Sequence, residues 1–161
     1  MVQFAMFSGR VVAIQDIHFG EYREGCTKII SLQNEAGAQV NFILTPSTYV
    51  VNQAMIKIGD MVTGYYDAHA PAVMIYPPQY IALVMVKEGM RDYVKVSYFN
   101  RDLMSQDGQL ILHIQPSTKV ITTNGQIFSH SLNDRDLIVI YSHSTKSIPA
   151  QTTPKEVIVL C

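Results

Sequence analysis

One six-residue pattern, Pro-Ser-Thr-x-Val-[Val/Ile], occurs twice in this chain of 161 residues, at 46–51 and again at 116–121. Repetition at a long interval indicates a duplicated domain when several features recur in the same order. Three further features follow both copies: a Gly-Asp or Asn-Asp pair, a strand whose end contains Tyr and one polar residue, and a Pro-x-Gln step before a closing apolar strand. This shared order predicts that the chain contains two homologous units.

The spacing of these features sets the boundaries of the two units. The first Pro of the pattern lies 31 residues before the Pro of the Pro-x-Gln step in the first copy, and 33 residues before it in the second. Charged residues and Gly89 within 87–92 are typical of a short linker. We therefore predict two domains, residues 1–88 and residues 92–161, of which the second is reduced.

The chain consists mostly of short runs rich in Val, Ile, Tyr and Phe, separated by Gly, Pro, Asn and Asp. No window holds a helical stripe for more than about three turns, so the pattern predicts an all-β protein. The expected strands are 9–17, 27–32, 38–44, 61–67 and 80–86 in the first unit, and 93–98, 109–114, 119–122, 137–142 and 157–160 in the second.

Five strands per unit, with at most a short helical turn at 48–55, are the elements of a five-stranded OB-like Greek-key barrel. We expect two such barrels in tandem, and the alternative is one two-sheet sandwich built from both halves. Proline lacks the N–H that a central strand needs, so 67–80 is expected to be an extended excursion between the fourth and fifth strands. In an OB barrel that excursion borders the binding face.

This excursion carries the candidate binding residues. Three prolines stiffen it, and a rigid loop that presents tyrosines suits a binding surface, because little conformational entropy is lost when a partner docks. The alternative is that Tyr76 and Pro77 plug the open end of their own barrel. The second copy keeps the Pro-x-Gln step but lacks the tyrosines and the histidine. The candidate ligand- or partner-binding residues are Asp67, His69, Tyr76 and Tyr80.

The composition indicates that the chain associates with other copies. Charged residues make up 16% of it, against about 25% in an average soluble domain, while 48% is hydrophobic and the net charge is −1. The apolar surplus is covered either by a second copy or by a well-filled β core. We expect a homo-oligomer, with other protein partners left open.

Nucleic-acid binding, metal binding and catalysis find little support. The 12 basic residues face 13 acidic ones without any basic run or tryptophan, which disfavours nucleic acid. The five histidines and two cysteines show no metal-ligand spacing, and there is no GxSxG, GxGxxG or P-loop motif. We therefore predict no metal, no cofactor, no catalytic residue and no enzymatic activity, and we interpret Ser129-His130-Ser131 as a polar connection. Cys161 could link to a neighbouring chain, and the redox state of Cys26 and Cys161 is left open.

No segment reaches the roughly 18 apolar residues that a membrane helix needs, and no secretory signal pattern is visible. We expect no membrane insertion and a cytoplasmic location by default. A location on the spore or cell surface, reached by a route that the sequence does not show, stays open.

Two segments, Gly59–Tyr80 with "GYYD", "AP" and "IYPPQY" and Ser147–Leu160 with "SIPAQT", resemble those of small uncharacterised tandem β-barrel proteins of spore-forming Gram-positive bacteria. The resemblance covers about a quarter of the chain. It implies a bacterial source and is compatible with a stationary-phase or spore-associated structural role, and it carries over no site residue.

Three functions follow from the sequence, from different classes. The first is a non-enzymatic structural or interaction protein that self-associates. The second is a ligand-binding OB module for oligosaccharide or single-stranded nucleic acid. The third is a hydrolase of unknown type.

Overall fold

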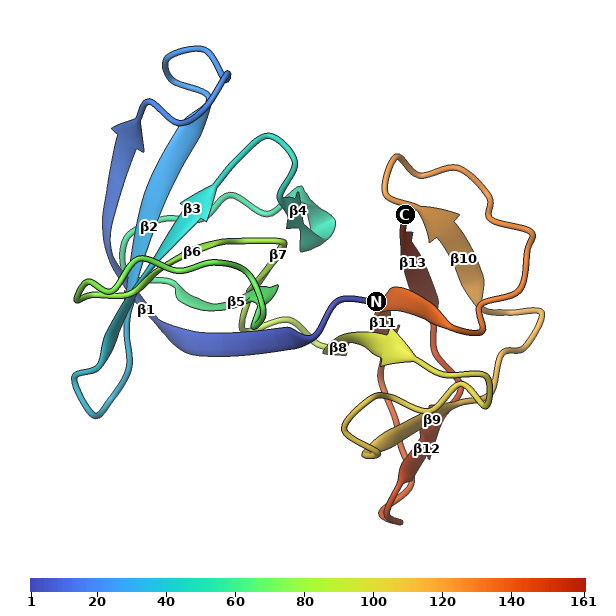
Figure 1. The fold of residues 1–161 in the computed structure, drawn as a ribbon. Coiled ribbons are helices and arrows are strands. Elements are labelled where there is room, and N and C mark those ends of the chain that lie inside the picture. Colours follow the sequence, from blue (N-terminus) through green and yellow to red (C-terminus); the bar gives the residue numbers. More distant parts are fainter. The chain divides into compact units, whose positions relative to one another are not determined.

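The computed structural model describes residues 1–161 and is all-β, with no α-helix and a single short 3-10 turn (Figure 1). Two compact units divide the chain. The N-terminal unit is Ala5–Gly89, and the C-terminal unit is Met90–Cys161 together with Met1–Phe4. The structure has no helix of the length and hydrophobicity that crossing a bilayer requires.

The N-terminal unit contains one seven-stranded sheet with the order β4-β7-β5-β1-β2-β3-β6. Strands β1, β2 and β3 pair antiparallel in sequence, β5 pairs antiparallel with β7, and the pairs β3–β6 and β4–β7 are parallel. Its elements are β1 (Phe4–Ile17), β2 (Thr27–Gln33), β3 (Gln39–Leu44), β4 (Tyr49–Val50), the 3-10 turn (Val51–Gln53), β5 (Met61–Asp67), β6 (Gln79–Ile81) and β7 (Val84–Lys87).

The C-terminal unit contains a four-stranded sheet, β10-β13-β11-β8, and a two-stranded sheet, β12-β9. Strand β11 pairs antiparallel with β13 and β8, whereas the pairs β10–β13 and β9–β12 are parallel. Its strands are β8 (Tyr93–Phe99), β9 (Leu110–Leu112), β10 (Lys119–Thr122), β11 (Arg135–Tyr141), β12 (Ala150–Thr152) and β13 (Glu156–Leu160).

The expected count of five strands per unit is wrong, because the structure has seven and six. The expected strand 80–86 is divided into β6 and β7 where the chain changes partner: Ala82 N–H donates to Ile43 O at 2.9 Å, and Leu83 N–H donates to Tyr65 O at 2.8 Å. One extended segment therefore joins β3 on one side to β5 on the other. Short strands also follow each Pro-Ser-Thr turn, as β4 and β10.

The repeated Pro-Ser-Thr turn has the same hydrogen bonds in both units. The Thr48 hydroxyl accepts a bond from its own turn, from Thr45 N–H at 3.0 Å, and donates to Ala82 O at 2.7 Å. The Thr118 hydroxyl likewise accepts from Gln115 N–H at 3.3 Å and donates to Pro154 O at 2.8 Å. Each threonine thus closes its turn and ties it to the segment that precedes the last strand of its unit.

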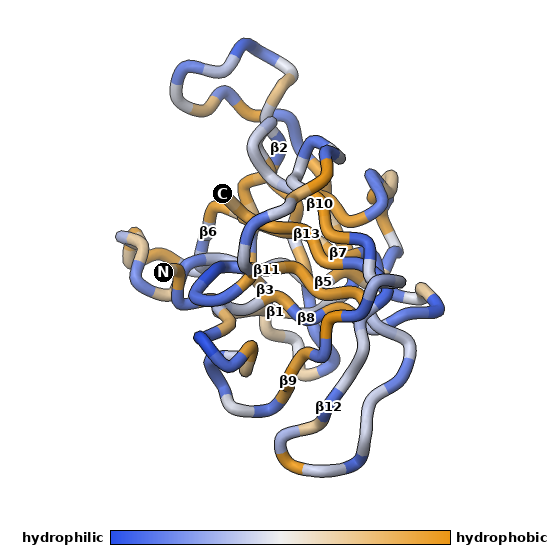
Figure 2. The backbone as a smooth tube through the Cα atoms, turned by 90° about the vertical axis from the view of Figure 1, so that its right-hand side faces the viewer, coloured by the Kyte–Doolittle hydropathy of each residue, from blue (hydrophilic) through white to orange (hydrophobic).

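Each unit has its own apolar core, and the apolar residues follow the strands while polar residues follow the loops (Figure 2). The middle residues of β11 and β13 are all Val, Ile or Leu, because side chains on both faces of these strands are buried. The buried core residues are Val11, Ile30, Leu32, Val40, Phe42, Val62, Ala82 and Met85 in the N-terminal unit, and Phe99, Leu110, Leu112, Leu132, Leu137, Val139, Val157 and Val159 in the C-terminal unit.

Candidate functional site: an exposed loop and a pocket

The connection between β5 and β6, residues 68–78, is a loop fixed at both ends. At its start the Asp67 carboxylate accepts a hydrogen bond from His69 N–H at 3.0 Å, and Asp67 O accepts one from Ala70 N–H at 3.1 Å. At its end Pro78 O accepts a bond from Asn41 N–H at 2.9 Å, which joins the loop to β3. Asp67 therefore shapes the base of the loop with its carboxylate.

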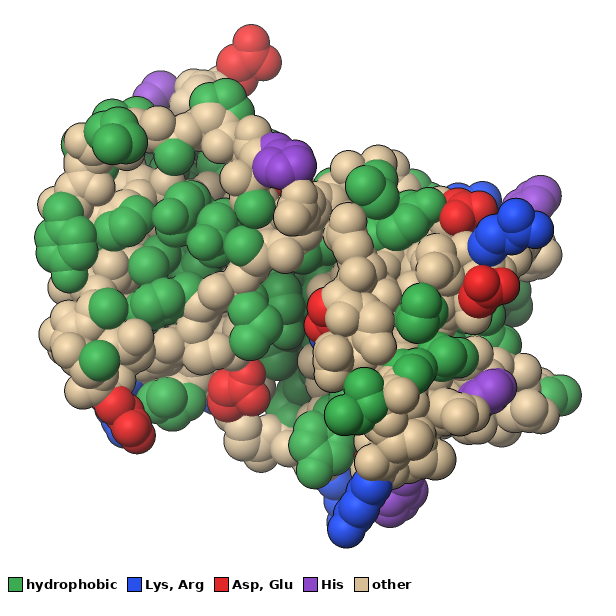
Figure 3. Space-filling model, turned by 60° about the horizontal axis from the view of Figure 1, so that its bottom comes forward, with side chains coloured by type: hydrophobic (Ala, Val, Ile, Leu, Met, Phe, Trp, Pro, Cys, Tyr) green, Lys and Arg blue, Asp and Glu red, His purple; other side chains and the backbone are tan.

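The tip of this loop exposes consecutive apolar side chains, and we call residues 73–76 the apolar tip. Val73 is 72% exposed, Met74 is 99% exposed and Tyr76 is 74% exposed. The chain has no Asp, Glu, Lys or Arg from residue 68 to residue 86. Figure 3 shows one face of the molecule, where apolar side chains reach the surface between sparse charged groups. Exposed apolar groups that lie next to one another make the tip a candidate binding surface.

Tyr80 lies in a different environment from Tyr76. Its ring stacks on that of Tyr66 with centroids 3.8 Å apart and planes within 8° of parallel. Both rings pack against Phe42, at centroid distances of 5.9 Å for Tyr66 and 6.3 Å for Tyr80. Burial, followed by the hydrogen bond with Tyr80, raises the pKa of the Tyr66 hydroxyl. Tyr80 thus belongs to the edge of the N-terminal core.

Of the four residues predicted from the sequence as a binding set, the structure exposes His69 and Tyr76, which lie on the loop itself. It uses Asp67 to hold the start of the loop, and it packs Tyr80 beneath it on β6. The fifth predicted residue, Cys161, is an exposed free thiol, and so is Cys26.

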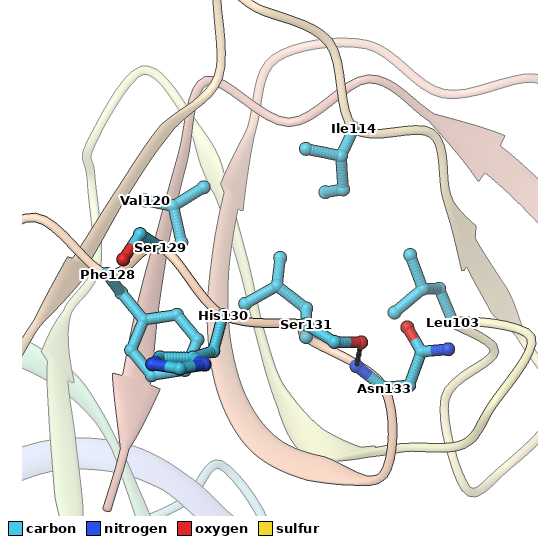
Figure 4. A pocket seen from close by; sticks show the side chains of 9 residues that line it. Leu103, Ile114, Val120, Phe128, Ser129, His130, Ser131 and Asn133 are labelled. Carbon is cyan, nitrogen blue, oxygen red and sulfur yellow. Dashed lines mark hydrogen bonds between the residues drawn. The ribbon is translucent and has the colours of Figure 1, made fainter.

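The C-terminal unit has a pocket of about 290 Å³ (Figure 4). The pocket is formed by the β8–β9 loop, the segment after β9, strand β10 and the β10–β11 loop. Figure 4 shows Phe128 and His130 together on one side, Leu103 and Asn133 on the other, and Ile114 at the far end. None of the nine lining side chains is an Asp, Glu, Lys or Arg. They are Leu103, Ile114, Val120, Phe128, Ser129, His130, Ser131, Leu132 and Asn133.

The residues of one pocket wall are linked to one another and to Arg135 by several contacts. The Arg135 guanidinium lies 4.7 Å from the centroid of the Phe128 ring, and its Nε–H donates to Ser131 O at 2.8 Å. The His130 ring meets the Phe128 ring edge-on, with centroids 6.0 Å apart. The Ser131 hydroxyl accepts a bond from Asn133 N–H at 3.2 Å. Ser129-His130-Ser131 lies in the β10–β11 connection and also forms part of the pocket wall.

Sequence reasoning missed this pocket because its residues come from four separate segments. The available signal was the alternation of Phe128, His130 and Leu132 with serines, which is the spacing of an extended segment with one apolar face. Phe128 and Leu132 do pack against the C-terminal core.

The shifted carboxyl groups belong to surface ion pairs away from the loop and the pocket. The backbone N–H of Lys57 lowers the pKa of Asp60, and the Lys87 ammonium, 3.3 Å away, acts in the same direction. Burial raises the pKa of Asp107, but hydrogen bonds led by that from Lys95 outweigh it, so the pKa lies below its ordinary value. The structure contains no group of three or more His, Cys, Asp and Glu side chains that could hold a metal ion.

Fold and surface together define an all-β protein of two compact units, with an exposed apolar tip on one and a small apolar pocket on the other. Comparison with protein-family models gives no match, and no curated protein is detectably similar to the chain.

Proposed function

We propose that this chain is a non-enzymatic interaction protein, built from two tandem OB-type units, that associates with copies of itself. The observation that carries the proposal is the apolar tip, residues 73–76, which stands exposed on a loop fixed at both ends. The low charge of the chain supports it further, since a net charge of −1 sets little repulsion between copies.

The strand pairing supports the tandem OB-type architecture. The order β4-β7-β5-β1 of the N-terminal unit corresponds to β10-β13-β11-β8 of the C-terminal unit, and the parallel pair β3–β6 corresponds to β9–β12. Strands β6 and β7 are separated by two residues and yet occupy opposite sides of the sheet order, as expected for a segment that closes a barrel. The matching bonds of Thr48 and Thr118 fit the same duplication.

The energetics favour association through several apolar side chains at once. Burial of one side chain of this size contributes about 1.5–3 kcal/mol, whereas association of two proteins costs about 4–15 kcal/mol in lost freedom of motion. Burial of a single exposed side chain therefore cannot offset the cost of association. Burial of Val73, Met74 and Tyr76 together, on a preorganised loop, supplies a substantial part of the required free energy. We expect weak, concentration-dependent association.

Sedimentation velocity of the purified chain at about 1, 10 and 100 μM tests the proposal. The weight-average mass should rise with concentration and should change little between low and high NaCl, because apolar contacts are not screened by salt. A strictly monomeric protein at about 100 μM would refute self-association.

Ligand binding is the second candidate, and one observation favours it. The Tyr66 and Tyr80 rings form a parallel, partly exposed stack, and aromatic faces of this kind bind sugar rings or bases. Titration with a mixed set of oligosaccharides and with oligo-dT, followed by tyrosine fluorescence, tests it. Saturable binding that Tyr80→Ala abolishes, at a temperature where circular dichroism shows the variant to be folded, would favour this candidate over self-association.

A further inference from the structure

We propose that the apolar tip of one molecule inserts into the pocket of the C-terminal unit of a second copy, with Tyr76 as the inserted side chain. This inference rests on the proposed self-association and assigns its interface. The two surfaces lie on different units of the same chain, so every molecule carries one donor and one acceptor.

The donor is preorganised for insertion. The loop is held at Asp67 and at Pro78, and within the tip Ile75 N–H donates to Val73 O at 2.8 Å, which folds the tip into a tight turn. A fixed loop loses little conformational entropy when it docks. Tyr76 also offers a large ring with few rotatable bonds, which is the property that makes tyrosine common at binding hot spots.

The acceptor matches one large side chain in size. Pockets for drug-sized molecules are typically about 300–1,000 Å³, so a cavity of about 290 Å³ lies at the lower limit and suits a single ring with part of its neighbour. The apolar part of its wall consists of Leu103, Ile114, Val120, Phe128 and Leu132.

The chemistry of the two surfaces agrees. The pocket combines this apolar wall with a rim of hydroxyl, imidazole and amide groups at Ser129, His130 and Asn133. Tyr76 combines an apolar ring with one hydroxyl, and a buried tyrosine hydroxyl usually finds a hydrogen-bond partner. Neither the loop nor the pocket lining contains a charged side chain, so docking buries no unpaired charge.

Other exposed apolar side chains fit this role less well. Ile127 and Ile148 are 86% and 83% exposed, but no other exposed large apolar side chain is adjacent to either of them in sequence. Consecutive exposed apolar residues occur at the tip, and only a tyrosine there carries a polar group that the rim can satisfy. Ile148 therefore serves as a matched control, because it directly precedes the proline of the second Pro-x-Gln step, as Tyr76 precedes that of the first.

The geometry of the contact has a consequence for the assembly. A contact between two different surface patches is heterologous, and each docked molecule still offers a free tip or a free pocket. These free surfaces either meet each other, which gives a dimer closed by two reciprocal contacts, or bind further molecules, which gives a larger ring or an open chain. A contact between two tips would instead stop at a symmetric dimer.

A complementation experiment with two full-length variants tests the proposal. Tyr76→Ala removes the inserted ring and keeps the pocket, whereas Ser129→Trp fills the pocket mouth and keeps the tip. Both positions are exposed, so we expect both variants to fold. Each alone should associate about 30-fold or more weakly than the unmodified chain, which is the effect of losing a hot-spot residue. Mixed in equal amounts they should form a heterodimer and nothing larger, while Ile148→Ala should assemble normally.

The possible results separate the inference from the proposed function. If the unmodified chain assembles and Tyr76→Ala assembles equally well, the inference is wrong and self-association stands. If both variants are monomeric and their mixture stays monomeric, the tip does not meet the pocket of another molecule. A monomeric unmodified chain contradicts both proposals.

A second measurement keeps the proposal testable if Ser129→Trp fails to fold. A synthetic peptide of residues 67–80 is titrated into Tyr76→Ala protein and followed by NMR, with a Tyr76→Ala peptide as control. Shifts in the resonances of Val120, Phe128 and His130 with the first peptide alone support the proposal. Equal binding of the two peptides, or shifts elsewhere only, would overturn it.

Discussion

A single added methyl group at Gly64 tests the packing beneath the exposed loop. Gly64 lies in β5 and is buried, and a Cβ atom there would stand 2.5 Å from Cε2 and 2.6 Å from Cζ of the Phe42 ring. Real Cβ atoms do not approach carbon this closely, so the Phe42 ring must move. Its space is limited, because the rings of Tyr66 and Tyr80 pack against it and Phe42 itself is fully buried.

The expected cost follows from overpacking. Extra carbon in a filled core costs about 1–3 kcal/mol, and the crowded ring puts Gly64→Ala toward the upper end of this range. For a unit of this size each kcal/mol lowers the melting temperature by roughly 4–8 °C. The loss should fall on the N-terminal unit, since Phe42 belongs to that core.

Scanning calorimetry of a double-mutant cycle gives the decisive result. Phe42→Leu removes the ring atoms that the added methyl group would meet, so the double variant should be more stable than the sum of the two single effects predicts, by about 1 kcal/mol or more. Additive losses in the cycle would show that the Gly64 methyl group does not meet the Phe42 ring, and would refute the packing described above.

Two further perturbations probe other parts of the fold. Thr118→Val removes the buried hydroxyl that donates to Pro154 O, and it should destabilise the C-terminal unit by about 1–3 kcal/mol. Thr48→Val should destabilise the N-terminal unit less, because Thr48 is only half-buried. Chemical denaturation of the two variants compares the two losses of stability, and an equal or reversed order would contradict the burial argument. Asp107 has a pKa that the Lys95, Ser105 and Gln109 hydrogen bonds lower in the folded chain, so its contribution is present above its unfolded pKa of about 3.9 and is lost as the pH falls through the folded pKa. Asp107→Asn should therefore flatten the fall in melting temperature below about pH 4, by a small amount because the pair is partly exposed, and an unchanged acid profile would remove Asp107 from that role.

Several strands were predictable because their signals are local, whereas β4 and β12 were not predicted. Alternating apolar residues and turn formers indicate β2, β3 and β5 almost to the residue, and the repeated Pro-Ser-Thr pattern indicates where a strand ends and a turn is capped. The division of the last strand was not predictable, because it depends on which neighbours the backbone of Ala82 and Leu83 meets.

The candidate site also has one part that local sequence predicts and other parts that depend on long-range contacts. The exposed tip could be predicted from the prolines and from the absence of Asp, Glu, Lys and Arg within 68–80. The position of Tyr80 could not be predicted, since its stack with Tyr66 joins β5 and β6, which are not neighbours in the strand order of the sheet. The pocket likewise forms only where four segments, distant in sequence, come together, and no short stretch of sequence predicts that contact.

The first residues of the chain have a consequence for how it is made. Met1–Phe4 belong to the C-terminal unit, and Val2 N–H donates to the Asp136 carboxylate at 3.3 Å. During translation residues 1–4 emerge before the N-terminal unit, whereas their partners in the C-terminal unit emerge after it. The N-terminal unit can fold co-translationally from contiguous sequence, whereas residues 1–4 must wait until β11 has left the ribosome before they can bind Asp136.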